Sequence, residues 1–314
     1  MTATLPRIQR LTHSDFTCDL DATTEELRSL LELACDVKRS PERYRTALTG
    51  KSLALLFEKP SLRTRVTFEL AIQQLGGFAI LHDGRIDGRE PLKDVARNLE
   101  RWVSGIVART FLQQTVDDLA LWSSVPVINA LSDMWHPCQV LADMQTIQEH
   151  FGETRGLKLA FVGDGNNVAR SLLLNATRLG MCFSIATPPG YALPADVVDL
   201  AGGGEGDVEI GTDPVTAVCG AQIVYTDVWT SMGEEHEAAA RRAVFAGYQV
   251  NDELFSHAAP EAIFMHCLPA HRGEEVTDSV IESSRSVVFD EAENRLHAQK
   301  ALLLMLLGPE ALGR

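Results

Sequence analysis

The stretch "SLALLFEKPSLRTRVTFELAIQQLGG" (Ser52–Gly77) joins a short apolar run to a longer helical pattern. Its first six residues are nearly all apolar, which is typical of a buried strand. Leu62, Val66 and Leu70 recur every fourth residue before a glycine pair, so a helix is predicted from about Leu62 to about Leu75. A strand followed by a helix is the repeating unit of a parallel α/β sheet.

The same alternation continues along the chain of 314 residues, a length that favours two domains. The polar stretch "EHFGETRG" (149–156) separates two halves, and further helices are predicted after Pro137 and at about Glu291–Leu307. We therefore predict an α/β fold with two domains, each a parallel β-sheet flanked by helices. The predicted strands are Ser52–Phe57, Phe78–Leu81, Gly105–Ala108, Val125–Asn129, Lys158–Val162, Phe183–Ala186, Gln222–Thr226, Ala262–His266 and Val287–Phe289.

Composition and charge restrict the possible functions. The formal net charge of −15 argues against a nucleic-acid partner, because phosphate backbones require a basic protein face. An anionic substrate would need positive charge supplied locally. The first residues lack the apolar region of a signal peptide, no apolar run is long enough to span a membrane, and the six cysteines form no CxxC pair. A cytoplasmic protein with free thiols is expected.

In open parallel sheets, ligands bind beyond the carboxyl ends of the strands, and four predicted strand ends are rich in polar residues. The first is the opening stretch, where Ser61 occupies a helix N-cap position and Leu62, Arg63 and Thr64 form the first turn. Free N–H groups, the helix dipole and a guanidinium all favour an anion there. A capped surface helix with solvated arginines explains the pattern equally well.

The second strand end reads "ALSDMWHPCQVLAD" (130–143). Pro137 suits the first position of a helix, with His136 at its cap and Gln139 in its first turn. A lone histidine is more often structural than catalytic, but a histidine and a glutamine at a second helix start favour a binding site. Cys138 faces elsewhere and is predicted to serve packing.

The third and fourth strand ends lie in the second half. In "DVWTSMGEE", a capping box explains Ser231 and Glu234, whereas Asp227 is free to bind an amino group. In "MHCLPAHRGEE", the thiol of Cys267 is placed to contact a substrate. A zinc site could in principle be formed by His136, Cys138, His266, Cys267 and His271. These residues lack the spacing of a structural zinc site, so no metal is expected.

The segment "FVGDGNNVA" (161–169) resembles a loose dinucleotide fingerprint. Its third glycine is missing and no acidic residue ends the following strand, which argues against a nicotinamide cofactor. No organic cofactor is expected. The loop is still placed to present Asn166 or Asn167 to a different ligand.

Taken together, these segments resemble the aspartate/ornithine carbamoyltransferase family, and among its members the enzymes that use ornithine. The resemblance implies that a carbamoyl group passes from carbamoyl phosphate to the δ-amine of L-ornithine, giving L-citrulline and phosphate in arginine metabolism. It also implies a carbamoyl phosphate domain (1–148), an ornithine domain (149–290), a last helix (about 291–314) that packs on the first domain, and a homotrimer or a multiple of trimers. The matching segments, in order from Phe57, are "FEKPSLRTRVTFE", "VARTF", "SDMWHPCQVLADMQTI", "GDGNNVARS", "DVWTSMGEE", "HCLPAHRGEEV" and "DEAENRLHAQKALL".

The same resemblance assigns roles to individual residues. It implies that Arg109, His136, Asp227 and Cys267 are catalytic, and that the Leu268–Pro269 bond is cis. Ornithine would be held by Asn167, Asp227, Ser231, Met232 and Cys267. Carbamoyl phosphate would be held by Ser61, Leu62, Arg63, Thr64, Arg109, His136, Gln139, Leu268 and Arg295.

Two positions depart from the family pattern. Leu62 stands where many ornithine enzymes have a threonine, but that position can act through its backbone N–H. In "HDGRIDGREPLKD" (82–94), Arg85 stands where the family has a glutamine in a mobile loop. Either Arg85 substitutes as a phosphate donor, or the loop is arranged differently. Two alternatives to the ornithine reaction remain open: a carbamoyltransferase for another amine, and a non-catalytic homologue that acts as a binding partner.

Overall fold

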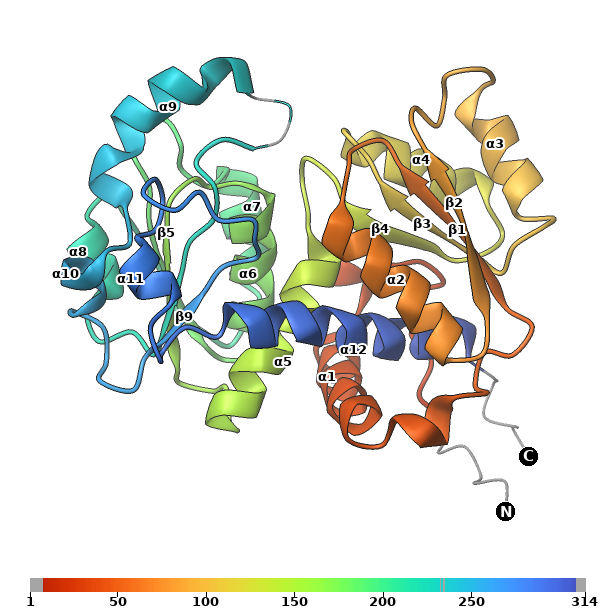
Figure 1. Ribbon diagram of the computed structural model, residues 1–314, viewed down its shortest axis with the longest axis horizontal. Coiled ribbons are helices and arrows are strands. Elements are labelled where there is room, and N and C mark those ends of the chain that lie inside the picture. The colour runs from red at the N-terminus through yellow and green to blue at the C-terminus, as the bar shows by residue number, and fades with distance from the viewer. Residues whose placement is uncertain (1–7, 232, 234, 309–314) are drawn as a thin grey trace. The chain divides into compact units, whose positions relative to one another are not determined.

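The structure is a computed structural model that describes residues 8–231, 233 and 235–308. The chain forms two compact units (Figure 1). Unit 1 comprises the chain up to Gln145 together with the part from Glu293 onward, and unit 2 comprises Thr146–Ala292. Two helices run through the boundaries between the units, α5 (Pro137–Phe151) and α12 (Val288–Leu307).

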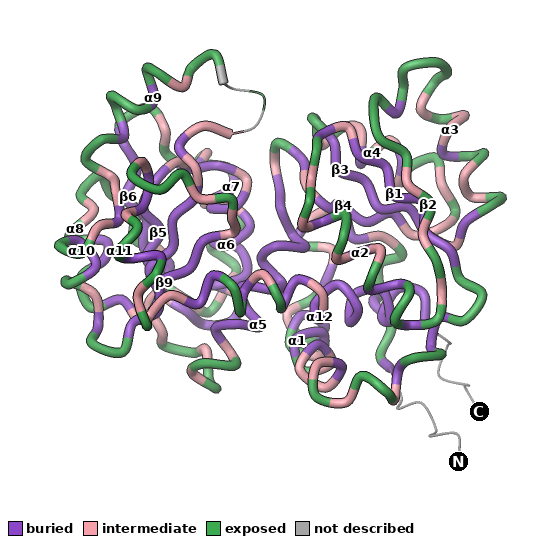
Figure 2. Tube along the Cα trace, viewed as in Figure 1, coloured by how far each residue is buried: buried purple, intermediate pink, exposed green. Residues whose placement is uncertain are grey.

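Unit 1 contains a parallel sheet of four strands in the order β2-β1-β3-β4. The two central strands, β1 and β3, are buried along their whole length, whereas β2 lies at an edge and is largely exposed (Figure 2). The strands are β1 (Ser52–Phe57), β2 (Phe78–Asp83), β3 (Gly105–Arg109) and β4 (Val127–Leu131), which confirms the four strands predicted for this half.

Helices cover both faces of this sheet. Ala54 and Leu56 of β1 pack with Ala96, Val116 and Leu119 of α3 and α4, so the alternate residues of β1 face the opposite side. The helices of unit 1 are α1 (Thr24–Arg39), α2 (Leu62–Gln74), α3 (Leu92–Leu99) and α4 (Gln113–Trp122), with the 3₁₀ turns η1 (Asp19–Asp21) and η2 (Pro41–Tyr44). The helix predicted from Leu62 is confirmed as α2.

The last helix packs on unit 1, as expected. From Glu293 onward α12 belongs to unit 1, and the side chains of 301–307 are buried. The backbone N–H of Leu11 donates to the carbonyl of Met305 at 3.3 Å, which ties the start of the described chain to this helix. The part of the chain that the structure describes contains no helix long and apolar enough to cross a membrane.

Unit 2 contains a parallel sheet of five strands in the order β7-β6-β5-β8-β9. The sequence prediction missed β7, a short and mostly exposed edge strand. It also wrongly placed a strand at Val287–Phe289, where α12 begins, because periodicity cannot separate a short apolar run from the start of a buried helix. The strands are β5 (Lys158–Val162), β6 (Cys182–Ala186), β7 (Val208–Gly211), β8 (Ile223–Tyr225) and β9 (Ile263–Met265).

The connections of unit 2 are short helices and turns that pack around Val224 and Phe264. All strands of each sheet run parallel, so their carboxyl ends lie at one edge, which is where the candidate residues follow the strands. The helices are α6 (Asn167–Arg178), α7 (Ala195–Ala201), α8 (Pro214–Val218), α9 (Ala238–Phe245), α10 (Asp252–Phe255) and α11 (Asp278–Ile281), with the 3₁₀ turns η3 (Glu235–Glu237) and η4 (Ala246–Tyr248).

Candidate active site

The first group of candidate residues begins where β1 gives way to α2. Ser61 is the N-cap residue of α2, as predicted, but its side chain makes no capping hydrogen bond. Arg63 is half-buried and Thr64 is buried, whereas Leu62 is 76% exposed. The hydroxyl of Ser61 is therefore not used by its own helix, and the side chain of Leu62 adds no polar group.

Arg295 of α12 connects this helix start to a second one. Its Nη2 donates to Oγ1 of Thr64 at 3.0 Å, and its Nη1 donates to Oε1 of Gln139. The amide nitrogen of Gln139 donates along α5 to Oδ1 of Asp143 at 2.8 Å. Buried hydrogen bonds thus join α2, α5 and α12 around one guanidinium. Nothing in the local sequence pattern marked Asp143 as part of this group.

His136 lies immediately before α5 and is positioned by the turn that precedes it. The hydroxyl of Ser132 accepts the backbone N–H groups of Met134 at 3.3 Å and Trp135 at 3.1 Å, which closes that turn. The imidazole of His136 is 5% exposed. Serine hydroxyls commonly stabilise turns by hydrogen-bonding to nearby backbone groups.

His136 is uncharged at neutral pH. Burial holds the pKa of His136 well below its usual value, and the positive charges of Arg295, Arg109 and Arg63 lower this pKa further. Arg109 ends β3 and is 8% exposed. Three guanidinium groups therefore act on one neutral imidazole, an arrangement that suits a bound dianion.

Two other residues of this unit, Cys138 and Arg65, take structural positions. The thiol of Cys138 is buried, donates to the carbonyl of Asn129 at 3.3 Å and has a pKa raised to about 12 by burial, which confirms its packing role. Arg65 is paired with Glu69 at 3.2 Å and with Asp83 at 3.3 Å.

Arg85, which differs from the family pattern in the loop after β2, is also paired locally. The guanidinium of Arg85 lies 3.1 Å from the carboxylate of Asp87, and both side chains are exposed. In this arrangement the charge of Arg85 is balanced within its own loop.

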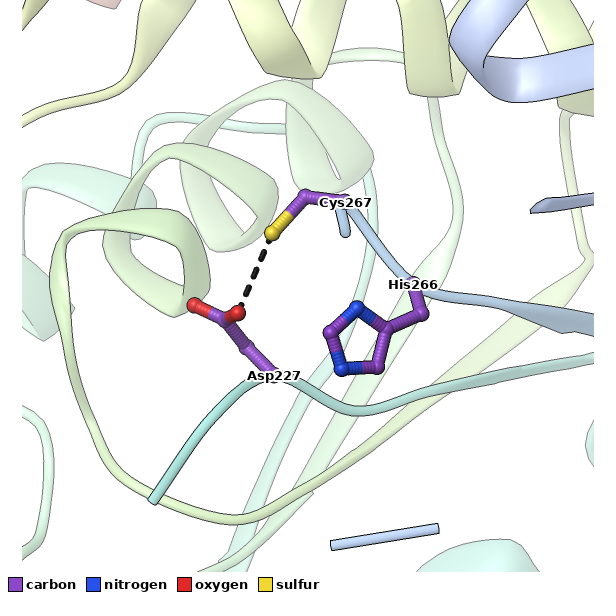
Figure 3. A group of neighbouring side chains, drawn as sticks. All are labelled: Asp227, His266 and Cys267. Atoms are coloured by element: carbon purple, nitrogen blue, oxygen red, sulfur yellow. Dashed lines mark hydrogen bonds between the residues drawn. The ribbon is translucent and has the colours of Figure 1, made fainter. Parts of the chain in front are cut away.

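The second group of candidate residues lies in unit 2 at the ends of β8 and β9. Asp227 accepts three hydrogen bonds: from the thiol of Cys267 at 3.1 Å, from the amide nitrogen of Asn166 at 2.8 Å and from the backbone N–H of Val228 at 2.8 Å. Figure 3 shows Asp227 and Cys267 pointing toward one another, with the ring of His266 beside them. The predicted convergence of Asp227 and Cys267 is therefore found in the structure.

Asn166 is fixed by the helix that it begins. It is the N-cap residue of α6, and its Oδ1 accepts the N–H groups of Val168 and Ala169. That cap leaves its Nδ2 facing Asp227, so the structure brings Asn166 to the carboxylate. Asn167 is the first residue of α6 and is half-buried.

Leu268 has an unusual backbone conformation. Its φ angle is +57°, in the left-handed region, which costs a residue other than glycine roughly 1–2 kcal/mol. Its N–H donates to Nδ1 of His266 at 2.9 Å, which holds the turn. The Leu268–Pro269 peptide bond is cis, as the family resemblance implied.

The remaining ornithine-site candidates lie in the loop after β8. Ser231 is half-buried, but Met232 and Glu234 lie outside the described residues, so the predicted capping box and the predicted role of Met232 stay predictions.

Asp227, His266 and Cys267 form a group whose possible metal-ligand atoms lie within 4.8 Å of one another. Both ring nitrogens of His266 already have partners, because Nδ1 accepts the Leu268 N–H and Nε2 lies 3.1 Å from Glu275. A metal ion bound by this histidine would have to displace one of these bonds. Each side chain of the trio is therefore already engaged in a hydrogen bond, Cys267 with Asp227 and His266 with Leu268 and Glu275.

Two buried acids around this cluster were missed by the sequence reasoning. Glu275 faces the ring of His266, and Glu291 in the first turn of α12 accepts the His266 backbone N–H at 3.0 Å and the Tyr225 hydroxyl at 3.2 Å. Acidic residues are nearly always exposed. No local pattern separates the buried Glu275 from its half-exposed neighbour Glu274.

Comparison with known families finds two matches that together span most of the chain. Residues 14–149 match the model described as "Aspartate/ornithine carbamoyltransferase, carbamoyl-P binding domain". Residues 155–306 match the model described as "Aspartate/ornithine carbamoyltransferase, Asp/Orn binding domain".

Individual relatives agree with these matches. The chain is 51% identical over 306 residues to an ornithine carbamoyltransferase of Thermococcus kodakarensis, covering 94% of this chain and 96% of the relative. It is 53% identical over 302 residues to one of Symbiobacterium thermophilum, covering 93% and 97%. The solved structure of the ornithine carbamoyltransferase from Pyrococcus furiosus superposes with a TM-score of 0.90 at 49% identity, covering 93% of this chain and 96% of that one.

Proposed function

The chain belongs to the aspartate/ornithine carbamoyltransferase family, and on that premise we propose that it transfers the carbamoyl group of carbamoyl phosphate to the δ-amine of L-ornithine. The products are L-citrulline and phosphate. The observation that carries this proposal is the set of three arginines that act on the neutral, buried His136. An acidic chain with a net charge of −15 has concentrated positive charge at one place, and a phosphate dianion is the ligand that needs it.

Carbamoyl phosphate is assigned to unit 1. Charge-assisted hydrogen bonds to the phosphate contribute roughly 1.5–3 kcal/mol each. Because neutral His136 keeps one ring nitrogen protonated, it can donate to the carbonyl oxygen of the carbamoyl group without adding a fourth positive charge. The residues proposed to hold this substrate in unit 1 are Ser61, Leu62 through its backbone N–H, Arg63, Thr64, Arg109, His136, Gln139 and Arg295.

The chemical step is attack of the δ-amine on the carbonyl carbon. Negative charge then develops on the carbonyl oxygen, and Arg109, His136 and Thr64 are the proposed donors that stabilise it. The carbon–oxygen bond to phosphate breaks, and the leaving phosphate takes the proton from the amine.

Ornithine is assigned to unit 2. The nucleophile must be a neutral amine, and deprotonating an alkylammonium with a pKa of about 10.4 costs about 4–5 kcal/mol at pH 7. Asp227 and Cys267 are proposed to orient the amine and assist proton loss. Unit 2 also contributes Asn167, Ser231 and Met232 for ornithine, and Leu268 for the carbamoyl group.

The test is citrulline formation from carbamoyl phosphate and ornithine by the purified protein. We expect Arg63→Gly to abolish it, because the dianion site loses a guanidinium. Arg65→Gly is the matched control on the same helix, since Arg65 is paired with Glu69 of α2 and with Asp83 of β2. An active Arg63→Gly protein would contradict the proposed anion site. Carbamoyl phosphate should also raise the melting temperature, as a ligand of the native state must.

Acceptor specificity needs a separate measurement. The family contains enzymes for other amines, so the assay is repeated with putrescine, lysine and an acylated ornithine. We expect ornithine to give the highest kcat/KM, and we expect Cys267→Ala to raise the KM for ornithine and to shift its pH dependence. A higher kcat/KM for another amine would move the proposal to that acceptor. A protein that binds carbamoyl phosphate and carbamoylates none of the amines would be the non-catalytic homologue.

We propose a homotrimer as the assembly. Unit 1 exposes apolar side chains on edge strand β2, with Phe78 at 54% and Ile80 at 57%, and on neighbouring α2, with Leu62, Val66 and Leu70. An uncovered apolar edge strand favours association, and a second copy of the chain is the partner that the family implies. Sedimentation should give the mass of a trimer or of a multiple of trimers. Ile80→Glu should reduce that mass, whereas Leu200→Glu on unit 2 should not.

The remaining assignments follow from the same premise. Residues 1–148 with the last helix are proposed as the carbamoyl phosphate domain, and 149–290 as the ornithine domain. A cytoplasmic location is proposed because all six cysteines are free thiols. Fluorescence of a tagged chain in the native cell would test the location.

A further inference from the structure

Glu275 and His266 are the most deeply buried titratable pair beside the proposed ornithine site. Both side chains have no exposed surface, and Nε2 of His266 lies 3.1 Å from Oε1 of Glu275. Neither residue is assigned a role in the proposed reaction. A buried acid that faces a buried histidine requires an explanation, because burying ionisable groups is costly unless they are paired.

The backbone of Leu268 decides which nitrogen of His266 carries the proton. The Leu268 N–H donates to Nδ1 at 2.9 Å, so Nδ1 must present a lone pair. The single proton of the neutral ring is then on Nε2, where the Glu275 carboxylate accepts it. If Nδ1 were protonated, its N–H would face the N–H of Leu268, and the hydrogen bond between them would be lost.

Glu275 is itself held in place by the loop that it belongs to. The same Oε1 atom accepts the backbone N–H of His271 at 2.6 Å. The backbone carbonyl of Glu275 accepts the N–H of Val250 at 2.8 Å, which anchors the loop to a neighbouring segment of unit 2. The carboxylate is therefore a fixed acceptor, and the ring orients to it.

A second acid fixes the backbone of His266. Oε2 of Glu291 accepts the His266 N–H at 3.0 Å, and Oε1 of Glu291 accepts the Tyr225 hydroxyl at 3.2 Å. With its backbone held on one side and its ring held on the other, His266 has one orientation. The neighbouring residues Cys267 and Leu268 depend on that orientation, since Leu268 has the left-handed φ of +57°.

We propose that Glu275 is a positioning residue that holds His266 in its Nε2–H tautomer, so that Nδ1 fixes the Leu268 N–H and keeps the Cys267–Leu268 turn ready for substrate. The inference rests on the proposed function, in which Cys267 and Leu268 contact substrate. It explains why an acid is buried there: a carboxylate accepts but cannot donate, so it selects one tautomer of the ring. Misplacing a substrate-contacting group by about 1 Å can cost about 10²-fold in rate.

The first measurement is made on the unaltered protein. Labelling histidine with ¹⁵N distinguishes a protonated nitrogen from an unprotonated one, and His266→Gln identifies the signals. We expect an unprotonated Nδ1 and a protonated Nε2 at neutral pH. A protonated Nδ1 would overturn the proposal, whatever the activity of the protein.

The second measurement compares variants of two adjacent acids. Glu275→Ala removes the acceptor, and we expect kcat/KM for citrulline formation to fall by about 10²-fold, with loss of the single tautomer. Glu275→Gln retains an oxygen that accepts from Nε2–H, so it should keep the tautomer and most of the rate. Glu274→Ala is the control, because Glu274 directly precedes Glu275 in the loop and its carboxylate pairs with Arg242 of α9 at 2.9 Å.

The outcomes separate this proposal from the proposed function. A folded Glu275→Ala protein with kcat/KM within about twofold of the unaltered one would overturn the positioning role. A Glu275→Gln protein that keeps the tautomer but loses about 10²-fold would also overturn it, and this test stands if the alanine variant fails to fold. Absence of citrulline formation by the unaltered protein would instead contradict the proposed function, while the tautomer measurement would still decide the role of Glu275.

Discussion

The two candidate clusters of this molecule are built in opposite ways. In unit 1, burial lowers the pKa of His136, and the charges of Arg295, Arg109 and Arg63 lower it further. In unit 2, Asp227 is surrounded by matched donors, from Asn166 and Cys267. The first cluster carries excess charge of one sign, whereas the second satisfies its polar groups from within the protein.

This difference favours a different kind of ligand at each cluster. A set of like charges is costly without a counter-ion, so the unit 1 cluster gains most when a dianion binds. A satisfied hydrogen-bond network keeps its shape without a ligand, so the unit 2 cluster presents Asp227 and Cys267 in a prepared geometry. Removing a charge from the unit 1 cluster should therefore affect mainly catalysis, whereas removing an acceptor from the Asp227 network of unit 2 should also cost stability.

The largest expected effect is on catalysis by unit 1. Arg295→Met removes the strongest charge acting on His136 and the hydrogen bonds to Thr64 and Gln139. We expect citrulline formation to slow by about 10²–10³-fold, as for the loss of one transition-state donor.

A second readout of the same variant does not depend on activity. The pKa of His136, followed by NMR titration, should rise toward its usual value once the Arg295 charge is gone. Arg155→Met is the control, since Arg155 is exposed and paired with Glu205. An unchanged His136 pKa in Arg295→Met would remove Arg295 from the charge cluster.

The next effect is on the stability of unit 2. Asp227→Asn places an amide NH₂ group where Oδ2 accepts from Nδ2 of Asn166. Asn166 cannot turn its amide over without losing the cap of α6, because its Oδ1 accepts from Val168 and Ala169. A buried donor is left facing a donor, and we expect a loss of about 1–3 kcal/mol in the free energy of unfolding.

Chemical denaturation measures this loss. The control is Asp213→Asn at the N-cap of α8, where asparagine caps as well as aspartate, so a change of about 0.5 kcal/mol or less is expected. Equal changes in both variants would mean that Asp227 is not held in a satisfied network.

How much of this contrast could be predicted depends on the range of the interactions. The strand-end rule identified Arg63, His136, Asp227 and Cys267 as site candidates, because it needs only a strand pattern and the polar residue after it. The choice of ornithine as the acceptor came from the family resemblance.

What the sequence could not predict arises from contacts between distant segments. Glu291 meets the backbone of His266 across 25 residues, and no local pattern marks a carboxylate for burial. The sequence did not decide whether Asn166 or Asn167 faces Asp227, because that depends on which of them caps α6. Helix boundaries are the least certain part of a prediction from sequence patterns. The missed strand β7 is short and mostly exposed, so it lacks the apolar signal of the others.

A smaller effect follows from the charge cluster as pH falls. Burial and the three arginines lower the pKa of His136 well below 6.5, so below pH 6.5 the unfolded chain binds a proton that the folded chain does not. Stability is therefore expected to fall with decreasing pH, by up to about 1.4 kcal/mol per pH unit for this group. His297, whose pKa is also lowered, mainly by burial, adds a loss of the same sign.

Thermal unfolding between pH 7 and pH 5 tests this linkage. His136→Gln should flatten the dependence, because glutamine cannot be protonated in the unfolded chain. His236→Gln is the control on an exposed side chain. A slope that is the same in His136→Gln and in the unaltered protein would mean that His136 is not held neutral by the cluster.

The smallest expected effect on stability compares two helix caps in unit 1. Thr23 caps α1 through a side chain that accepts the Glu26 N–H at 3.2 Å, so Thr23→Ala should cost about 1 kcal/mol. Ser61 occupies the same position at α2 but makes no side-chain capping bond, so Ser61→Ala should change stability by about 0.5 kcal/mol or less. If the Ser61 hydroxyl is kept for the phosphate, the alanine variant will melt normally and bind carbamoyl phosphate more weakly. A stability loss equal to that of Thr23→Ala, with unchanged binding, would show that Ser61 serves its helix instead.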